Sequence, residues 1–202
     1  VSFMRKCKDI GSGKASGANK SASFRLKRTE VAFTFVLKIL KMKSIQSMNW
    51  TEIIESLNAK GYAIIPEVLS KPECEHLQGF YEDDQLFRRV ISMERYRFGK
   101  GEYKYFNYPL PPIIQVLRES FYQPLSTLAN GWMQKLRVEI QYPEQHQKLL
   151  ELCKAKNQLR PTPLILRYQP GGYNTLHQDL YGEVYFPFQV VFVLTQQGVE
   201  HE

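Results

Sequence analysis

The sequence predicts an α+β fold in which helices come first and strands follow. Apolar residues recur at helical spacing through much of residues 49–157, while β-branched and aromatic residues dominate after Pro163. The size agrees, because 202 residues with 43% hydrophobic and 13% aromatic content suit one globular domain with a real core. Helices followed by strands are typical of a sheet or barrel that helices cover.

Residues 1–41 form a basic segment, Lys/Ser/Gly-rich at first, without helical or strand patterning. Residues 1–43 hold eleven Lys and Arg against two acidic residues, whereas the rest of the chain holds 16 basic and 18 acidic residues. The net charge of +7 therefore says nothing about the partner of the folded part. Two interpretations stay open: a disordered arm that touches nucleic acid, or upstream sequence outside the working protein. We favour the second, because Met42 or Met48 precedes the first well-patterned element, and we expect the domain to be residues 42–202.

The cysteine pattern and the hydropathy of the sequence indicate the cellular compartment. Cys7, Cys74 and Cys153 are odd in number and lack paired spacing, which fits a reducing compartment rather than a disulfide framework or a zinc knuckle. The longest apolar run, Val31–Leu40, is too short to span a bilayer, which takes about 20 apolar residues. It also sits too deep for a signal peptide. We expect a cytoplasmic protein without a membrane partner.

Four helices are predicted from local signals. Asn49 can cap the first helix, and Gly61 stops it. Ser70 and Glu73 carry a capping-box pattern with proline just inside the start of the second helix. The third helix is expected to bend at Pro124. The four helices are one that ends at Asn58, one that begins after Ser70, Pro112–Leu136 and Pro143–Asn157.

Strands are predicted where β-branched and aromatic runs are bounded by turn residues. Pro66 ends the first strand, and two strands surround the turn at Gly99-Lys-Gly101. Gly171-Gly172 and Tyr181-Gly182 separate three further strands. The predicted strands are Tyr62–Ile65, two within Val90–Phe106, Leu164–Tyr168, Tyr173–Gln178 and Val184–Thr195. A closed barrel needs several more strands than these, so we expect an incomplete one.

The chemically informative segment is Arg167-Tyr-Gln-Pro-Gly-Gly-Tyr-Asn-Thr-Leu-His-Gln-Asp-Leu-Tyr-Gly182. Within a strand, residues i and i+2 point to the same face, so His177 and Asp179 would present an imidazole and a carboxylate side by side. They would supply two of the three ligands of the 2-His-1-carboxylate arrangement, which holds Fe(II) and leaves open positions. A lone His-x-Asp also arises by chance as a surface pair or a turn, and the motif alone leaves that alternative open.

Five segments of the sequence around this motif resemble a known protein family. They are Glu94–Phe106, Tyr108–Pro111, Leu166–Tyr168, Leu176–Gly182 and Phe186–Leu194. Together they resemble a bacterial family of Fe(II)/2-oxoglutarate oxygenases described as acting oxidatively on damaged, methylated DNA, in the prolyl-hydroxylase-like branch of the superfamily. The resemblance spans roughly Trp50 to the C-terminus. It implies that N-terminal helices pack on a jelly-roll-like double-stranded β-helix, here incomplete.

The resemblance also implies roles for three residues. His177 and Asp179 match the first two iron ligands and are the expected catalytic centre, with Fe(II) as cofactor and 2-oxoglutarate as co-substrate. Tyr168 matches a tyrosine that hydrogen-bonds 2-oxoglutarate in such enzymes. A packed core aromatic is the equal alternative for Tyr168.

The family pattern further implies a distal histidine ligand and a basic residue that pairs with 2-oxoglutarate, several tens of residues after the first ligands. Only 23 residues follow Asp179, and the remaining histidine, His201, stands between two glutamates at a terminus that should fray. We therefore expect a C-terminally truncated site that lacks both groups. His76 and His146 lie on predicted helices and are expected to be ordinary surface or edge residues.

A second constellation interleaves cations with aromatic rings. Bases stack on aromatic faces while cations hold phosphate, so the alternation suits single-stranded or flipped-base DNA. The alternative is a hairpin with an aromatic core face and a solvated basic face. Glycines on both sides of Lys100 predict a mobile tip that could close over a substrate. The members are Arg88, Arg89, Arg95, Arg97, Lys100, Lys104, Tyr96, Phe98, Tyr103, Tyr105 and Phe106.

These features and the resemblance predict an Fe(II)/2-oxoglutarate-dependent dioxygenase. The expected reaction of the complete protein is oxidative demethylation of damaged nucleic acid, in which a hydroxylated N-methyl group collapses to formaldehyde. Two alternatives stay open. The same chemistry could act on a C–H bond of a protein or a small molecule, or the chain could be a truncated, non-catalytic product that keeps a binding surface.

Overall fold

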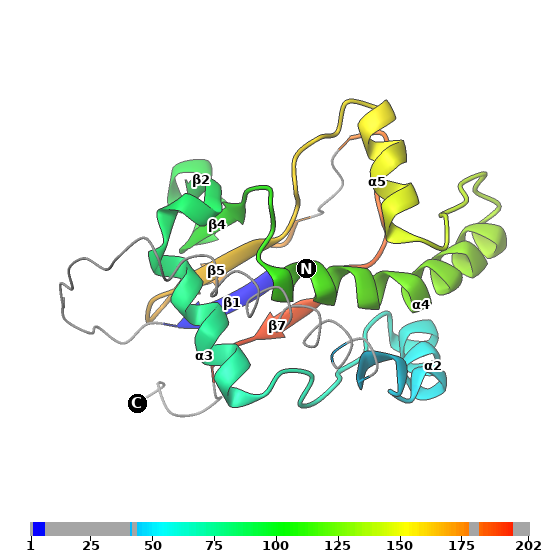
Figure 1. Cartoon of the computed structure of the whole chain (residues 1–202), viewed down its shortest axis with the longest axis horizontal. Coiled ribbons are helices and arrows are strands. Elements are labelled where there is room, and N and C mark those ends of the chain that lie inside the picture. Colours follow the sequence, from blue (N-terminus) through cyan, green and yellow to red (C-terminus); the bar gives the residue numbers. More distant parts are fainter. Residues whose placement is uncertain (1, 7–40, 42–43, 178–181, 196–202) are drawn as a thin grey trace, which may run out of the picture.

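A computed structural model describes residues 2–6, 41, 44–177 and 182–195 (Figure 1). Its strands are β1 (Ser2–Lys6), β2 (Phe87–Ser92), β3 (Gly99–Lys100), β4 (Glu102–Phe106), β5 (Leu164–Tyr168), β6 (Tyr173–Asn174) and β7 (Val191–Val193). Five of them form one sheet in the order β2-β4-β5-β1-β7, and β3 pairs with β6 in a second, small sheet. β4 is antiparallel to β2 and β5, whereas β1 is parallel to β5 and β7.

The helices cover this sheet. They are α2 (Trp50–Lys60), α3 (Lys71–Gly79), α4 (Pro112–Leu136) and α5 (His146–Ala155), with short 3-10 turns at Phe80–Glu82, Asp84–Leu86 and Glu94–Tyr96. Figure 1 shows α3 and α4 lying across one face of the sheet. The main hydrophobic core lies between these two helices and the sheet. Its members include Leu77 of α3, Ile114, Leu117 and Phe121 of α4, Phe106 of β4, Ile165 of β5 and Phe192 of β7. The predicted α+β class is therefore confirmed.

The capping residues predicted from the sequence are found at the ends of α2 and α3. The Asn49 side chain accepts a hydrogen bond from the backbone N–H of Glu52, and Gly61 ends α2 with a left-handed φ of 78°. Ser70 and Glu73 form the predicted capping box at the start of α3. α4 has the predicted bounds, with Pro124 inside it. α5 is shorter than predicted at both ends.

Two predicted strands are wrong in whole or in large part. Tyr62–Ile65 forms no strand, Ile64 is 84% exposed, and none of the described strands pairs with this segment. Within Val184–Thr195 only β7 is a strand. The aromatic residues Phe186 and Phe188, which suggested strand, instead pack against a cluster formed by α4 and α5. Tertiary contact therefore overrides their β-propensity.

The described strands do not close into a barrel, and the jelly-roll-like double-stranded β-helix stays a prediction. Residues Ser2–Lys6 form β1 between β5 and β7, although the sequence analysis expected no regular element there. Residues 7–40 lie outside the described residues, so the division of the chain at residue 42 also stays a prediction. Among the described helices, none combines the length and apolar character that crossing a bilayer requires.

His146 is buried at the start of α5, not exposed as the sequence analysis expected. The residue is 7% exposed, and its ring meets that of Tyr122 edge to face with centroids 5.3 Å apart. Burial, with a smaller contribution from the positive charge of Arg118, lowers the pKa of His146 to about 4. His76 on α3 is exposed, as predicted.

This burial predicts a pH-dependent stability. The folded pKa of about 4 lies below the ordinary 6.5, so the unfolded chain binds the proton more tightly. Stability is therefore fully present above pH 6.5 and falls as the pH drops toward 4, by at most about 3 kcal/mol. Chemical unfolding between pH 7 and pH 4 measures this loss. His146→Leu should flatten the curve in this range, whereas the exposed control His76→Leu should not, and equal curves for both variants would contradict the assignment.

Candidate active site

A tight glycine turn joins the two strands that carry the candidate residues. β5 ends at Tyr168, and β6 begins directly after Gly171 and Gly172. Gly171 has φ 74°, a conformation that favours glycine. A Cβ on Gly172 would lie 2.9 Å from the carbonyl oxygens of both Gln169 and Lys100, so a larger residue would force the backbone apart. The turn thus holds β6 against β3, where Lys100 stands in register with Tyr173.

His177 follows β6 and is held by backbone contacts. The Thr175 N–H donates to the carbonyl oxygen of Phe98 at 2.8 Å, and the Thr175 hydroxyl donates to the same oxygen at 2.9 Å. The Nδ1 atom of His177 lies 2.7 Å from the carbonyl oxygen of Thr175. A carbonyl oxygen only accepts, so in this contact the Nδ1 atom is the donor. A histidine ring oriented in this way can bind a metal through its other nitrogen, Nε2.

The rest of the predicted metal site lies outside the described residues. Asp179 and His201 are both among the residues not described, so the pairing of His177 with Asp179 stays a prediction. β6 ends at Asn174, short of the predicted end at Gln178. In the described ranges, no three His, Cys, Asp or Glu side chains gather into a metal-binding group. Of the two predicted metal ligands, His177 is the one that lies within the described residues.

Tyr168 is a core residue at the base of this turn. The side chain is 8% exposed and packs with Met93 and Leu166. Gly101 lies so close that a Cβ there would stand 2.8 Å from the Tyr168 ring. Burial raises the pKa of Tyr168, and a side-chain hydrogen bond with Asn174 opposes that rise. The packing interpretation of Tyr168 is thus supported, and a contact between its hydroxyl and 2-oxoglutarate stays a prediction.

The Arg95–Lys100 loop places an aromatic and cationic surface beside the His177 segment. The rings of Tyr96 and Phe98 stack with centroids 5.7 Å apart, and they are 42% and 43% exposed. The side chains of Arg95, Arg97 and Lys100 are exposed around them. Because Phe98 accepts both hydrogen bonds from Thr175, the loop is attached directly to the chain that leads to His177.

Two members of the predicted nucleic-acid segment, Lys104 and Phe106, are buried and cannot contact phosphates or bases. Lys104 is 8% exposed, donates to the carbonyl oxygen of Tyr81 at 3.0 Å and pairs with Asp84 at 2.8 Å. Phe106 is fully buried. The prediction that Lys104 and Phe106 contribute to a binding surface is therefore wrong. β2 and β4 pair antiparallel as the alternative interpretation predicted, but the basic residue Lys104 lies on the buried face with Phe106 rather than on a solvated face.

The basic side chains of the hairpin itself divide into two kinds. Arg88 is half-buried, with its guanidinium 4.4 Å from the centre of the Tyr105 ring and a hydrogen bond to the carbonyl oxygen of Pro161 at 3.2 Å. Arg89 is exposed, while Tyr103 is half-buried. Exposed cations and exposed rings therefore occur together in the Arg95–Lys100 loop rather than along the whole predicted segment.

The structure also contains a polar cluster that sequence reasoning missed. The fully buried Tyr81 ring lies 4.5 Å from Lys104 Nζ and 4.2 Å from the Arg167 guanidinium, measured to the ring centre. The Tyr81 hydroxyl donates to Glu102, whose carboxylate also lies 3.4 Å from Arg167. Arg167 immediately precedes Tyr168, so this cluster anchors the strand on which the candidate site stands. No sequence signal marks it, because its members come from three separate elements.

Comparison with known proteins agrees with the resemblance. The model of the Oxygenase-NA family, described as "Oxygenase, catalysing oxidative methylation of damaged DNA", matches residues 101–202. The uncharacterized proteins MT2286 and Rv2227, from two strains of Mycobacterium tuberculosis, are each 34% identical over 125 residues, which is 62% of this chain and 48% of each relative. The chain thus spans about half the length of the curated relatives it matches. No solved structure matches the chain. On the family match, this chain belongs to the Oxygenase-NA family of oxygenases.

Proposed function

We propose that the protein is an Fe(II)/2-oxoglutarate-dependent dioxygenase of the prolyl-hydroxylase-like branch that demethylates damaged, single-stranded DNA. The observation that carries the proposal is the placement of His177, with its Nδ1 atom 2.7 Å from the Thr175 carbonyl oxygen, next to the Arg95–Lys100 loop. The family description supports an oxygenase acting on damaged DNA. The direct test is succinate release that requires added Fe(II) and 2-oxoglutarate and rises when a methylated oligonucleotide is added.

In this proposal one group of residues would hold the metal and its co-substrate, and another would hold the DNA. His177 through Nε2 and Asp179 through its carboxylate would hold Fe(II). Fe(II) with 2-oxoglutarate and O₂ supplies, when bound, the oxidation of a C–H bond. The contact between His177 Nδ1 and the Thr175 carbonyl oxygen, 2.7 Å apart, sets the ring orientation. Tyr168 would contact 2-oxoglutarate through its hydroxyl.

The Arg95–Lys100 loop would hold the DNA strand. Stacked, exposed rings of Tyr96 and Phe98 offer faces for unpaired bases, and the neighbouring Arg95 and Arg97 offer charges for phosphates. This juxtaposition favours a single-stranded or flipped base, because a methyl group within a stacked duplex cannot reach a protein-bound metal. A protein or small-molecule substrate would need no such combination of rings and cations.

We expect the double variant Arg95→Ala/Arg97→Ala to lower the salt dependence of single-stranded DNA binding. Each neutralised phosphate of a single strand contributes about 0.7 to the slope of log K against log salt, so the slope should fall by about 1.4 units. The slope is measured by fluorescence anisotropy of a labelled oligonucleotide at salt concentrations from about 50 to about 200 mM.

Two variants separate charge from stacking in the same experiment. Tyr96→Ala should weaken binding by roughly 1–3 kcal/mol at every salt concentration and leave the slope unchanged. Lys135→Ala/Lys154→Ala removes two exposed charges from α4 and α5 and should leave both affinity and slope unchanged. Undetectable or salt-independent DNA binding, with 2-oxoglutarate turnover intact, would move the assignment to a protein or small-molecule substrate.

A further inference from the structure

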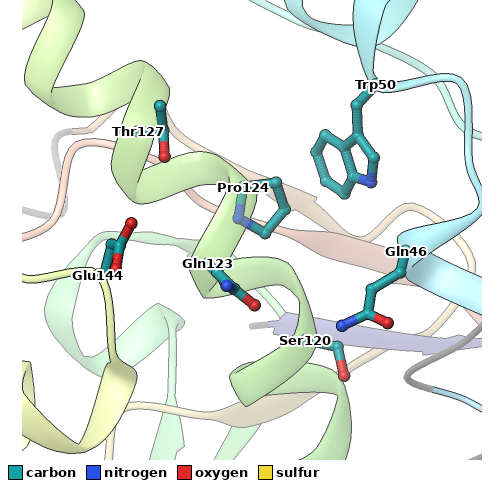
Figure 2. A pocket seen from close by; sticks show the side chains of 7 residues that line it. All are labelled: Gln46, Trp50, Ser120, Gln123, Pro124, Thr127 and Glu144. Carbon is teal, nitrogen blue, oxygen red and sulfur yellow. The ribbon is translucent and has the colours of Figure 1, made fainter.

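Outside the candidate active site, the described surface contains a hollow and a patch of cations. The hollow lies between Trp50 at the start of α2 and the middle of α4 (Figure 2). Among its described lining residues the charged one is Glu144, and a carboxylate repels the phosphates of a nucleic acid. The cations are Arg88, Arg89 and Arg160, here called the arginine patch, at the start of the β2–β4 hairpin. Their charge attracts phosphates.

A β-bulge places two of these arginines on one face of the sheet. The register between β2 and β4 shifts between Phe87 and Arg89, so Arg88 is the extra residue and Arg89 stands opposite Tyr105. Residues that stand opposite each other share a face, which places Arg89 on the Tyr105 face. The Arg88 guanidinium lies on the same face, 4.4 Å from the centre of the Tyr105 ring.

Arg160 adds a third charge from the chain that leads into β5. Arg88 donates to the carbonyl oxygen of Pro161 at 3.2 Å, so its guanidinium lies against the residue that follows Arg160. Burial lowers the pKa of Arg88, Tyr105 opposes this effect, and the charges of Arg160 and Arg89 lower the pKa further. The three positive charges are therefore close enough to repel one another.

Within the described part of the chain, no carboxylate forms an ion pair with any of the three arginines. Asp84 precedes β2 but pairs with Lys104 at 2.8 Å, and Lys104 lies on the face opposite to Tyr105 because successive strand residues alternate. Arg89 and Arg160 are exposed, so their guanidinium groups can be reached from solvent. The planar fork of a guanidinium matches two oxygens of a phosphate, which makes a phosphate the ligand that these groups fit.

Strand β2 connects the arginine patch to the Arg95–Lys100 loop. The Cα atoms of Arg89 and Arg95 are at most about 22 Å apart, because an extended chain advances by at most about 3.6 Å per residue. Successive phosphates lie about 3.4 Å apart along one strand of a duplex and further apart in an extended single strand, so this separation equals about three to six nucleotides. A strand that the loop holds beside His177 can therefore reach the arginine patch.

We propose that the arginine patch binds phosphates of the DNA strand about three to six nucleotides away from the base that reacts. Arg89 and Arg160 contact the phosphate oxygens, while Arg88, held against Tyr105 and Pro161, keeps the positive charge at the base of the patch. The substrate is thus a polynucleotide rather than a free nucleotide. This inference rests on the proposed function, because it extends the path of the DNA beyond the Arg95–Lys100 loop.

The experiment replaces chosen phosphates of an oligonucleotide by neutral methylphosphonates. A labelled single strand of about 16 nucleotides carries the methylated base at its centre. Neutral linkages stand either beside that base or about three to six nucleotides from it, on one side or the other. Fluorescence anisotropy measures the affinity of the full chain. On one of the two sides, the distal neutral linkages should weaken binding about tenfold, as expected from losing a charge-assisted contact.

Matched variants show whether the arginine patch makes this contact. Arg89→Gln/Arg160→Gln should bind the unmodified strand about tenfold more weakly and lose no further affinity from the distal neutral linkages, because both changes remove the same interaction. The linkages beside the methylated base should still weaken its binding. The control Lys135→Gln/Arg137→Gln removes two exposed charges at the end of α4 and should respond to the distal linkages as the wild type does.

The outcomes separate this inference from the proposed function. Wild-type binding that ignores the distal neutral linkages on both sides would overturn the phosphate site and leave the DNA assignment in place. The same holds if Arg89→Gln/Arg160→Gln keeps the wild-type response to those linkages. If the wild type bound no unmodified strand at all, the phosphate site and the DNA assignment would both be overturned.

Discussion

Asp179→Ala and His177→Ala should each reduce Fe(II)-dependent succinate formation below detection. Each variant removes one of the three protein ligands that the proposed site uses, and Asp179 supplies its carboxylate. The loss should exceed the roughly 10–100-fold effect of removing a group that only orients a ligand. The measurement is succinate released from 2-oxoglutarate, together with the electron paramagnetic resonance signal of bound Mn(II), which reports the metal without turnover.

Two variants show whether the loss is specific to the metal. Glu183→Gln changes an exposed carboxylate that stands four residues after Asp179 in the sequence and pairs with Lys156 at the surface, and it should leave turnover unchanged. Thr175→Val removes the hydroxyl contact to Phe98 and keeps the carbonyl that orients His177, so it should lower turnover by less than about 100-fold. Wild-type-like succinate formation by Asp179→Ala would exclude the proposed iron site.

The elements that could be predicted from the sequence are those whose signals are local. Asn49 and Gly61 delimit α2, and the capping box of Ser70 and Glu73 starts α3, because a helix end is satisfied by residues three or four positions away. β5 could also be predicted with its bounds, since its apolar run is bounded by proline and glycine. These signals require no knowledge of the rest of the chain.

The failures involve partners that are distant in sequence. Phe186 and Phe188 have strand-like composition, yet their rings pack against Tyr122 and Trp132 of α4 and against Tyr142 before α5. Lys104 belongs to an alternating basic pattern, yet Tyr81 and Asp84, about twenty residues earlier, bury it. Nothing in a local pattern reports such neighbours, so charge and aromatic content overestimated the binding surface.

The candidate site shows the same division. The order of Tyr168, a glycine turn and His177 could be predicted from the sequence. The hydrogen bonds from Thr175 to Phe98 join residues 77 positions apart, and the pattern did not predict them. These hydrogen bonds bring the loop with exposed rings and cations to the chain segment that leads to His177, as the proposed function requires.

Among single substitutions outside the metal site, we expect Tyr81→Ala to lower the free energy of unfolding the most. Tyr81 is fully buried, and both cations of the cluster, Lys104 and Arg167, lie against its ring. Truncation removes the aromatic volume, leaves a cavity and takes a hydrogen bond from Glu102. We expect a loss of about 3–5 kcal/mol in the free energy of unfolding, measured by urea denaturation.

The cluster can be dissected further because Tyr81→Phe keeps the ring and removes the hydroxyl. This variant should cost about 1.5–3 kcal/mol, the range for a hydrogen bond to a charged group, since Glu102 keeps its contact with Arg167. Tyr62→Ala is the matched control: Tyr62 is 59% exposed and should change stability by less than about 0.5 kcal/mol. If Tyr81→Phe proved as damaging as Tyr81→Ala, the hydroxyl rather than the packed ring would hold β4 and β5 to the helices. If Tyr81→Ala matched the Tyr62 control, the cluster would have no part in stabilising the strand that leads to Tyr168 and His177.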